Sequence, residues 1–549
     1  TKEKKHGDME TYDYIIIGGG SAGSVLAARL SEDEGASVCV LEAGPRDWHP
    51  FIHIPAGFMY TLVNPSVNWL YTSEASEWTG GRRIAAPRGK TLGGSSSING
   101  HIYNRGQRAD FDGWAQRGNL GWGYRDVLPY FRRSENRMTT TDPGSADPTF
   151  RGSEGNLPIT DLEWRDPLCE AFIEGAVQMG IPRNKDYNGT QQAGVSYVQR
   201  IIRNGRRVSA ARGYLYPAMS RGNLDVRTNA HVTNLMLDGK RAVGVRYLKG
   251  GRGGSPVEVR AAKEVILCGG AVNSPQLLQV SGIGPAPLLK SLGIEVKHEL
   301  RAVGENFRDH INARIVWRVK DPRVSYNHMA RGIGAVTQMM KYLTTGGGFM
   351  SLPSAPLLAF LRTRPELATP DVQMHIVPYS IKDPKTRKLQ DFPSMTISVY
   401  QLRPESLGSI HIRSKDPNAH PAIRFNFLHD PIDQAAMSEG FRMIRRIVDA
   451  PPMDEFRGEE YSPGLSVKSD AEILDWIRNN SQTAYHPIGT CRMGPAGPTT
   501  VVDDKLKVHG LEGLRVADAS IFPTMPSGNT NAPSIMVGEK MADILKAAA

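Results

Sequence analysis

Apolar and β-branched residues are concentrated in short runs near the beginning of the chain. Residues 12–17 (YDYIII) form such a run, and residues 21–32 (SAGSVLAARLSE) then read as a helix whose small side chains allow close approach to a strand. Residues 36–44 (ASVCVLEAG) form a second apolar run, near the end of which stands Glu42. Apolar runs of this length suit buried parallel strands, so we predict a strand–helix–strand unit with a glycine-rich first turn.

Related fragments recur in the middle and at the end of the chain. Residues 223–248 predict a meander of strands with a turn at Asp238–Gly239, and residues 264–282 predict a strand, a glycine turn and a helix. Residues 514–520 predict a further strand, which precedes a proline-containing loop and a helix over residues 531–546. We therefore expect one α/β domain assembled from three separated segments.

The intervening sequence has a different pattern. Between residues 370 and 430, apolar and polar positions alternate in three stretches, as expected of antiparallel strands with one covered face. Residues 439–450 and 470–480 have the spacing of amphipathic helices. These elements predict a second domain, made of a sheet and helices, that covers the first.

Composition limits the class of protein. The chain has 549 residues, of which 40% are hydrophobic and 22% are charged, as is usual for a soluble globular protein of two or more domains. The four cysteines form no C-x-x-C pair, so neither a zinc site nor a disulfide framework is expected. Scattered cysteines fit a reducing compartment, and we expect a cytoplasmic protein.

The charge is basic but not concentrated. Lys and Arg exceed Asp and Glu by 66 to 56, a net charge of +10, and the arginines are spread along the chain. This favours a solvated basic surface, with attraction to an anionic membrane surface or an acidic partner as the alternative. No nucleic-acid partner is expected, because aromatic and basic residues are not interleaved. The polar first ten residues resemble no secretory signal, and no apolar run reaches 18 residues, so any membrane association should be peripheral, at the inner face.

The turn after the first predicted strand has the spacing G-x-G-x-x-G, with Gly18, Gly20 and Gly23 in the glycine positions. Such a turn brings a pyrophosphate against backbone N–H groups at the start of a helix. Glu42 follows the last glycine by 19 residues, at the end of the next strand, where an acid can accept hydrogen bonds from a ribose. The combination predicts an ADP-containing dinucleotide, either FAD or NAD(P).

A second glycine-rich segment, residues 88–100 (RGKTLGGSSSING), offers many N–H and hydroxyl donors. Its composition fits either a flavin pyrophosphate and ring edge or an ordinary surface loop. With the residues that follow it, it resembles the first signature of the glucose–methanol–choline (GMC) oxidoreductase family, and residues 270–284 (GAVNSPQLLQVSGIG) resemble the second. Residues 485–494 (YHPIGTCRMG) and 516–543 resemble the carboxyl-terminal blocks of that family, in the same order.

The resemblance implies FAD, alcohol oxidation and a two-domain fold. The expected class is α/β, with a Rossmann-like doubly wound FAD-binding domain built from separated segments and an α+β substrate domain with a mostly antiparallel sheet. The FAD-binding domain would comprise residues 11–160, 206–310 and 503–549, and the substrate domain would comprise residues 161–205 and 311–502. The cofactor-binding residues implied by the family motifs are Gly18, Gly20, Ser21, Ala22, Gly23, Glu42, Ala43, Arg88, Thr91, Gly94, Ser95, Asn99, Gly100, His101, Ile102, Val232, Asp518, Ala519, Asn531, Ala532 and Pro533.

The catalytic pair implied by the family is His486 and Asn529, which are 43 residues apart. A histidine with a pKa near neutrality can take the hydroxyl proton as hydride leaves for flavin N5. An asparagine cannot titrate, but its amide can donate to the alkoxide-like oxygen. His375 and Tyr485 are predicted to line the substrate cavity, and no metal site is expected beside His486.

The expected FAD is non-covalent, because the position at which some relatives attach the flavin through a histidine matches Ile98. The expected partners are a small-molecule alcohol and an electron acceptor, either a quinone or cytochrome or O₂, and the expected assembly is a monomer or homodimer. Dehydrogenase is favoured over oxidase by the resemblance to bacterial choline, alkanol and polyethylene-glycol dehydrogenases. Residues 343–361 look like an apolar segment over the cavity mouth, which suggests an uncharged, hydrophobic alcohol.

Two alternatives stay open on the same scaffold. Some relatives are lyases that cleave cyanohydrins and keep the flavin oxidised, and others are fatty-acid photodecarboxylases. The photodecarboxylases carry a cysteine where Leu402 stands here and lack the histidine at His486, so both positions count against that alternative.

Overall fold

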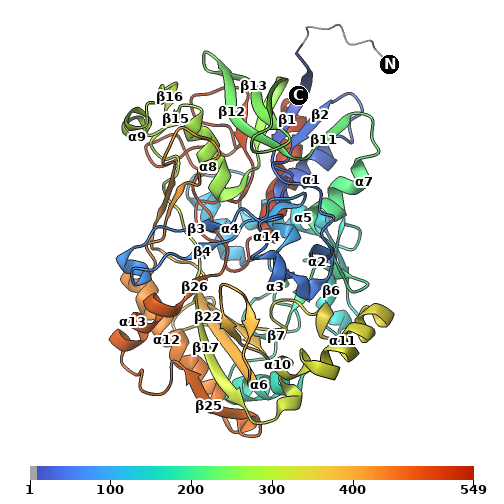
Figure 1. Ribbon diagram of the computed structural model, residues 1–549, viewed down its shortest axis with the longest axis vertical. Coiled ribbons are helices and arrows are strands. Elements are labelled where there is room, and N and C mark those ends of the chain that lie inside the picture. The colour runs from blue at the N-terminus through green and yellow to red at the C-terminus, as the bar shows by residue number, and fades with distance from the viewer. Residues whose placement is uncertain (1–8) are drawn as a thin grey trace.

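The computed structural model describes residues 9–549 and contains two large sheets, one above the other in Figure 1. The polar lead predicted for the first ten residues lies almost entirely outside the described residues. The upper sheet is mainly parallel and the lower sheet is antiparallel. This arrangement confirms the predicted fold class, whereas the exact domain boundaries stay a prediction.

The upper sheet brings together three distant parts of the chain. Its parallel strands run in the order β11 (Leu224–Arg227), β2 (Val38–Leu41), β1 (Thr11–Ile17), β14 (Ser255–Leu267) and β27 (Leu514–Val516). Helix α1 (Ser21–Leu30) packs against α14 (Asn531–Ala548), the last helix of the chain. A Cβ on Gly538 of α14 would lie 2.7 Å from the carbonyl oxygen of Ala22, so the missing side chain permits this close contact.

The predicted meander over residues 223–248 is only partly correct. β12 (Ala230–Asp238) and β13 (Arg241–Lys249) form an antiparallel hairpin around the predicted Asp238–Gly239 turn, and they continue onto the first half of β14. β11, however, pairs in parallel with β2 at the edge of the upper sheet, away from the hairpin. Alternation and turn residues could locate the three strands, but the partner of each strand depends on contacts between distant segments.

The lower sheet has the order β25 (Arg457–Ser462), β17 (Ile311–Val319), β22 (Ser394–Gln401), β19 (Val372–Val377), β18 (Leu357–Leu361) and β7 (Gly194–Tyr197). Its two faces differ because side chains alternate along each strand. One face is apolar and is covered by α12 (Pro431–Val448). The other faces a cavity, into whose wall β17 contributes three alternate side chains, Asn312, Arg314 and Val316.

One prediction for this part of the chain is wrong, and another is only partly correct. Residues 343–361 do not form one apolar segment, because they comprise the end of α11 (Gly332–Thr345), a loop with one 3₁₀ turn, and the fully buried strand β18. The predicted strand near residue 410 exists as β23 (Ser409–His411), but it pairs only with β24 (Ala422–Arg424) and packs against α8 (Gly270–Val280). It therefore lies outside the lower sheet.

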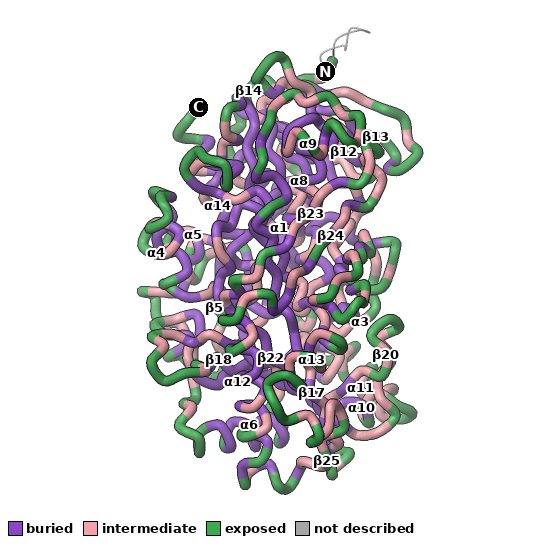
Figure 2. The backbone as a smooth tube through the Cα atoms, turned by 90° about the vertical axis from the view of Figure 1, so that its left-hand side faces the viewer, coloured by how far each residue is buried: buried purple, intermediate pink, exposed green. Residues whose placement is uncertain are grey.

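Burial is greatest along the long axis of the molecule, where the tube in Figure 2 is mostly buried. Other helices surround this core: α4 (Arg108–Gln116), α5 (Tyr124–Ser134), α6 (Pro167–Gln178), α9 (Ala286–Ser291) and α13 (Asp470–Asn480). All four cysteines are buried free thiols, which agrees with the predicted absence of a disulfide framework. None of the helices within residues 9–549 has the length and apolar content needed to cross a membrane.

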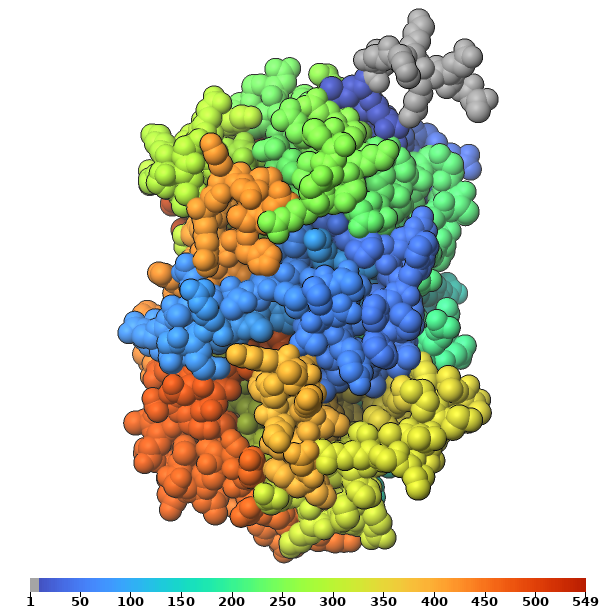
Figure 3. Space-filling view, viewed as in Figure 1, coloured from blue at the N-terminus to red at the C-terminus, as the bar shows by residue number. Residues whose placement is uncertain are grey.

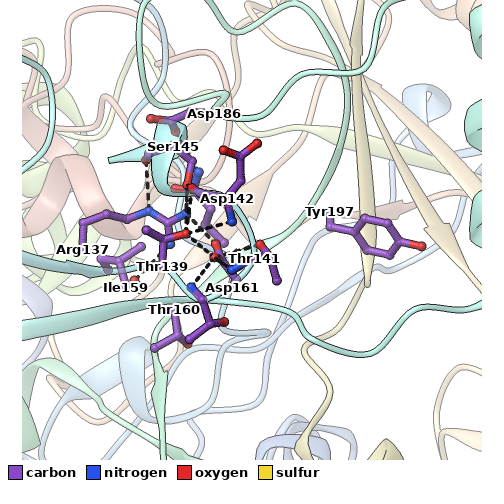
Figure 4. A network of polar contacts seen from close by, with 12 residues as sticks. Arg137, Thr139, Thr141, Asp142, Ser145, Ile159, Thr160, Asp161, Asp186 and Tyr197 are labelled. Atoms are coloured by element: carbon purple, nitrogen blue, oxygen red, sulfur yellow. Dashed lines mark hydrogen bonds and ion pairs between the residues drawn. The ribbon is translucent and has the colours of Figure 1, made fainter. Parts of the chain in front are cut away.

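A polar network fastens a surface loop to two neighbouring strands (Figure 4). Arg137 of β5 (Glu135–Met138) pairs with Asp161, the last residue of β6 (Leu157–Asp161). The other oxygen of Asp161 accepts the hydroxyl of Thr139 at 2.7 Å and the amide of Thr140 at 3.0 Å. Burial opposes ionisation of Asp161, but these hydrogen bonds and the charge of Arg137 outweigh it and lower the pKa of Asp161 to about 2.

We expect Asp161→Asn to destabilise the protein by about 2–4 kcal/mol, because it leaves the guanidinium of Arg137, only 1% exposed, without a counter-charge. A carboxyl group with a lowered pKa stabilises the fold above its unfolded pKa of about 3.9 and loses this effect as the pH falls through about 2. The acid-induced decrease of the unfolding midpoint should therefore be shallower in the variant. Exposed Glu163 supplies the control Glu163→Gln, and equal midpoints for the two variants would contradict the prediction.

Candidate functional site

A cavity of about 650 Å³ lies between the upper and lower sheets. Its cofactor half is formed by the glycine turn after β1, the loop of residues 87–100 and the first turn of α14. Its substrate half is formed by the cavity-facing side chains of β17, β19 and β22 and by residues 484–487. Segments from the beginning, middle and end of the chain therefore meet at one site.

Two glycine turns are in contact in the cofactor half. The amide of Gly93 donates to the carbonyl of Gly19 at 2.7 Å, and a Cβ on Gly94 would lie 2.8 Å from the Cα of Gly20. The side chains of Ser21 and Asn531, at the first turns of α1 and α14, are joined by a 2.8 Å hydrogen bond, so two helix amino termini meet here. Backbone N–H groups of two helices and a turn without side chains fit the diphosphate of a dinucleotide.

Glu42 lies in the wall beside this turn. Its carboxylate accepts the amides of Gly19 at 2.9 Å and Gly44 at 2.8 Å, and the side chain is almost fully buried. Burial raises the pKa of Glu42 to about 7, against the opposing effect of the two hydrogen bonds. Each oxygen keeps a further lone pair, so the group fits the ribose hydroxyls of an adenosine.

Most of the predicted cofactor residues lie in the cavity wall. They are Gly18, Gly20, Ser21, Ala22, Glu42, Ala43, Arg88, Gly94, Ser95, Asn99, Gly100, Ile102, Val232, Asp518, Ala519 and Asn531. Five predicted residues do not line it: Gly23, Thr91, His101, Ala532 and Pro533. For these five, the structure gives no direct contact with the space that a cofactor would fill.

Three of these five residues have other roles in the fold. A Cβ on Gly23 would lie 1.9 Å from the carbonyl oxygen of Gly18, so this glycine allows α1 to lie against β1. The Thr91 hydroxyl donates to the carbonyl of Pro45 at 2.9 Å and fixes the loop from behind. The ring of His101 is buried, with Nε2 2.9 Å from the carbonyl oxygen of Pro55. Each of these residues shapes the wall from outside it.

His486 and Asn529 meet in the substrate half. Nε2 of His486 is 3.1 Å from Nδ2 of Asn529, and both residues line the cavity. Burial, together with the neighbouring rings of His310 and His375, lowers the pKa of His486 well below its ordinary value. The imidazole is therefore neutral at pH 7.

The hydrogen bonds around His486 define its tautomer. Nε2 of His310 lies 2.9 Å from the carbonyl oxygen of Leu402, which can only accept, so this nitrogen carries the proton. Burial lowers the pKa of His310 to about 4, so its Nδ1 is unprotonated and accepts. Nδ1 of His486, at 2.9 Å, must then be the donor. Nε2 of His486 is thus unprotonated, and its lone pair accepts a hydrogen bond from the side-chain amide of Asn529.

Asp309 positions the peptide backbone of the two histidines. One of its oxygens accepts the amides of His310 at 2.7 Å and His486 at 2.9 Å, and the other accepts the Thr483 hydroxyl at 2.5 Å. Arg88 donates to the carbonyl of Tyr485 at 2.9 Å from the opposite side. Residues 483–486 are therefore held at both edges.

The predicted substrate-lining residues His375 and Tyr485 also lie in the wall. Nε2 of His375 is 2.9 Å from the side-chain nitrogen of Gln373, and burial lowers the pKa of His375 to about 3. Because an amide nitrogen only donates, Nε2 of this ring is an acceptor and the ring is neutral. His375 is thus a polar, uncharged part of the substrate half.

Sequence reasoning did not identify Asp309 or His310. Both precede the apolar run of residues 311–319, and an acid followed by a histidine at the start of a buried strand was an available signal. Arg314 and Arg387 were also missed. Arg314 is one of three polar positions in a strand that also contains Asn312 and Arg318, and Arg387 lies in a basic turn that gives no indication of facing inward.

Comparisons with known proteins agree with this architecture. Two family models, both described as GMC oxidoreductase, match residues 12–312 and residues 404–538. The "oxygen-dependent choline dehydrogenases" of Cronobacter sakazakii and Escherichia coli (strain K12) are each 42% identical over 544 residues, with 97% of this chain and 95% of the relative covered.

Solved structures show the same fold over the whole chain. The pyridoxine 4-oxidase of "Mesorbium loti" has a TM-score of 0.85 at 31% identity, with 97% of this chain and 98% of that chain covered. A formate oxidase of Aspergillus oryzae RIB40 has a TM-score of 0.90 at 29% identity, with 98% and 99% covered. The chain therefore belongs to the glucose–methanol–choline oxidoreductase family and is an FAD-dependent oxidoreductase.

Proposed function

We propose that this protein oxidises a primary or secondary alcohol to the aldehyde or ketone at His486 and Asn529. The observation that carries the proposal is the unprotonated Nε2 of His486, held 3.1 Å from the amide of Asn529 in the cavity wall. A hydroxyl between the two groups would give its proton to His486 and receive a hydrogen bond from Asn529. When bound, FAD supplies the acceptor for the hydride that leaves the alcohol carbon.

The cofactor half fits FAD held without a covalent bond. Ile98, at the position where some relatives attach the flavin, is a buried aliphatic residue that packs against Ile52 and Val67. The ring of His101 is turned to the carbonyl of Pro55 and is absent from the cavity wall. We accordingly propose that denaturation with acid releases all of the flavin into the supernatant.

The proposal includes a dehydrogenase rather than an oxidase, acting as a monomer or homodimer in the cytoplasm. The two dehydrogenases described above support this choice by similarity. Electrons would pass to a quinone or cytochrome, or to O₂. Turnover in air with and without an artificial acceptor, measured on the same preparation, tests this choice.

Replacing His486 with Ala should lower the rate of flavin reduction by about 10²–10⁴-fold, because the proton of the alcohol loses its acceptor. Asn529→Ala should cost less, roughly 10–10²-fold, and Asn529→His should restore part of the loss. Anaerobic stopped-flow bleaching of the flavin band with butanol, benzyl alcohol and choline gives these rates. Turnover without bleaching would instead indicate a lyase, and loss of fatty acid only under blue light a photodecarboxylase.

The role of His310 can be tested through its acceptor Nδ1. His310→Phe keeps a ring but cannot accept from His486, so the tautomer is no longer fixed and we expect about tenfold lower kcat. His310→Asn retains a carbonyl acceptor and should recover most of this loss. A purely structural role of His310 would lower kcat equally in both variants.

For the unmodified protein, kcat/KM should stay constant as the pH is lowered to the ordinary histidine pKa of about 6.5, because burial lowers the pKa of His486 below that value.

We further propose that the protein associates peripherally with an anionic membrane surface through α11. No residue of this helix is buried, and Ile333, Val336, Met340 and Leu343 are 86%, 63%, 55% and 67% exposed. Their spacing of 3, 4 and 3 positions places them on one face of the helix, and their exposure makes it the solvent face. Figure 3 shows α11 at the surface of the molecule, in yellow at the lower right. An apolar stripe on a convex helix suits lipid, which needs no shape complementarity.

Basic residues adjoin this stripe. Lys341 lies on α11 itself, and the hairpin carrying Arg203 and Arg206 touches Gly346 at the carboxyl end of the helix. Within residues 9–549 none of these three cations forms an ion pair. A symmetric dimer through this face would bring like charges together, whereas anionic lipid would neutralise them.

Val336→Asp combined with Met340→Asp should lower binding to equimolar phosphatidylcholine–phosphatidylglycerol vesicles at least tenfold in co-sedimentation. Leu120→Asp is the matched control, since Leu120 is 72% exposed on another part of the surface. Equal binding of both variants would contradict docking through α11. A dimer that dissociates in the double variant, without vesicle binding by the unmodified protein, would identify the face as a subunit interface.

A further inference from the structure

The substrate half of the cavity contains two guanidinium groups and no carboxylate. Arg314 projects from the middle of β17, and Arg387 comes from the turn of the hairpin formed by β20 (Ile381–Asp383) and β21 (Lys388–Leu389). The only acidic residues in the cavity wall are Glu42 and Asp518, both in the cofactor half. Their oxygens already accept backbone amides, from Gly19 and Gly44 for the first and from Gly270 for the second.

Neither arginine is neutralised by the protein. Within the described residues, no acid lies within ion-pair distance of Arg314 or Arg387. Nε of Arg387 is buried without a hydrogen-bond partner, and one terminal nitrogen meets only the sulfur of Met59 at 3.4 Å. Since a buried, unpaired guanidinium N–H is costly, an anionic partner from outside the chain is the natural complement.

The pKa of the neighbouring residue Tyr485 reflects the positive potential that the two arginines create in the substrate half of the cavity. Burial alone would raise the pKa of Tyr485, but the charges of Arg387 and Arg314, together with hydrogen bonds from their guanidinium groups to the phenol, outweigh it and lower the pKa. The three side chains therefore lie close together in the wall. Because Tyr485 directly precedes His486, the basic group and the proton acceptor are parts of one site.

The register of the lower sheet gives the approximate distance between Arg314 and His375. Arg314 of β17 is opposite Ser398 of β22, which is in turn opposite His375 of β19. Adjacent strands are about 4.8 Å apart, so Arg314 and His375 are about 10 Å apart across the cavity face. A molecule the size of a substituted benzyl alcohol can span the distance between the arginines and the histidines.

We propose that the substrate is an alcohol that carries a carboxylate, with the carboxylate bound by Arg314 and Arg387 and the hydroxyl placed between His486 and Asn529. This inference rests on the alcohol oxidation proposed above. The hydroxyl proton passes to Nε2 of His486, and the hydride of the same carbon passes to FAD. The product is the corresponding oxo acid, and the carboxylate is unchanged. Planar guanidinium groups bind a carboxylate through paired hydrogen bonds, which fixes its orientation.

A quaternary ammonium group fits poorly beside Arg314 and Arg387 in the substrate half of the cavity. Recognition of such a cation requires an aromatic cage or a carboxylate, whereas here it would face two positive charges. The expected uncharged, hydrophobic alcohol rested on residues 343–361 covering the cavity mouth, and those residues instead form parts of α11 and β18. The charges in the wall thus point away from choline and from a simple alkanol.

The experiment compares three substrates of one shape: para-hydroxymethylbenzoate, its amide, and its trimethylammonium analogue. The kcat/KM for the acid should exceed that for the amide by roughly 10–100-fold, as charge-assisted hydrogen bonds predict. Arg314→Met and Arg387→Met should each reduce this ratio about tenfold, mainly by raising the KM for the acid. Arg387→Lys should retain part of the preference. Lys385→Met removes a charge from the same hairpin but outside the cavity wall, so it should leave the ratio unchanged.

Binding is measured separately, by the change that benzoate produces in the absorption band of the oxidised flavin. The Kd for benzoate should rise about tenfold in each Met variant and stay constant in Lys385→Met. An amide or ammonium substrate equal to the acid, tighter binding of phenyl phosphate than of benzoate, or an unaltered ratio in the Met variants would each overturn the inference. If no alcohol bleaches the flavin while benzoate binds, the proposed alcohol oxidation fails and the anion site remains.

Discussion

Close backbone contact at the glycine turn after β1 is the constraint on which the rest of the structure depends. Gly18 has a φ of +102°, and its carbonyl oxygen occupies the space where a Cβ of Gly23 would lie. This packing places the start of α1 at the end of β1, where Gly19 then accepts the amide of Gly93. A methyl group at Gly23 would separate helix from strand, and the second glycine turn would lose its contact.

The substrate half depends on hydrogen bonding rather than on close packing. A carbonyl oxygen can only accept, so the carbonyl of Leu402 decides which nitrogen of His310 carries a proton, and that decides the tautomer of His486. Asp309 fixes the two backbones at the same time. Burial keeps both imidazoles neutral, which is the protonation state a proton acceptor needs.

Charge is distributed unevenly along the cavity. Helix amino termini, backbone amides and the side chain of Arg88 supply the positive potential of the cofactor half, whereas Arg314 and Arg387 supply that of the substrate half. Recognition of a substrate depends on a few side chains in the cavity wall, so 42% identity to choline dehydrogenases leaves the substrate of this protein open.

The sequence by itself determined the local elements, because hydrophobic period, glycine spacing and turn residues act over a few positions. It therefore predicted β1, α1, β2, the β12–β13 hairpin and α14, and the family motifs paired His486 with Asn529. Only the tertiary structure decided which strands are neighbours, as in the parallel pairing of β11 with β2 and the separate β23–β24 ribbon. It also decided that Thr91 and His101 stand behind the cavity wall, that Arg314 and Arg387 line it, and that His310 contacts His486. These outcomes depend on the direction of each side chain and on contacts between separated segments, such as that of β11 with β2, which no local pattern encodes.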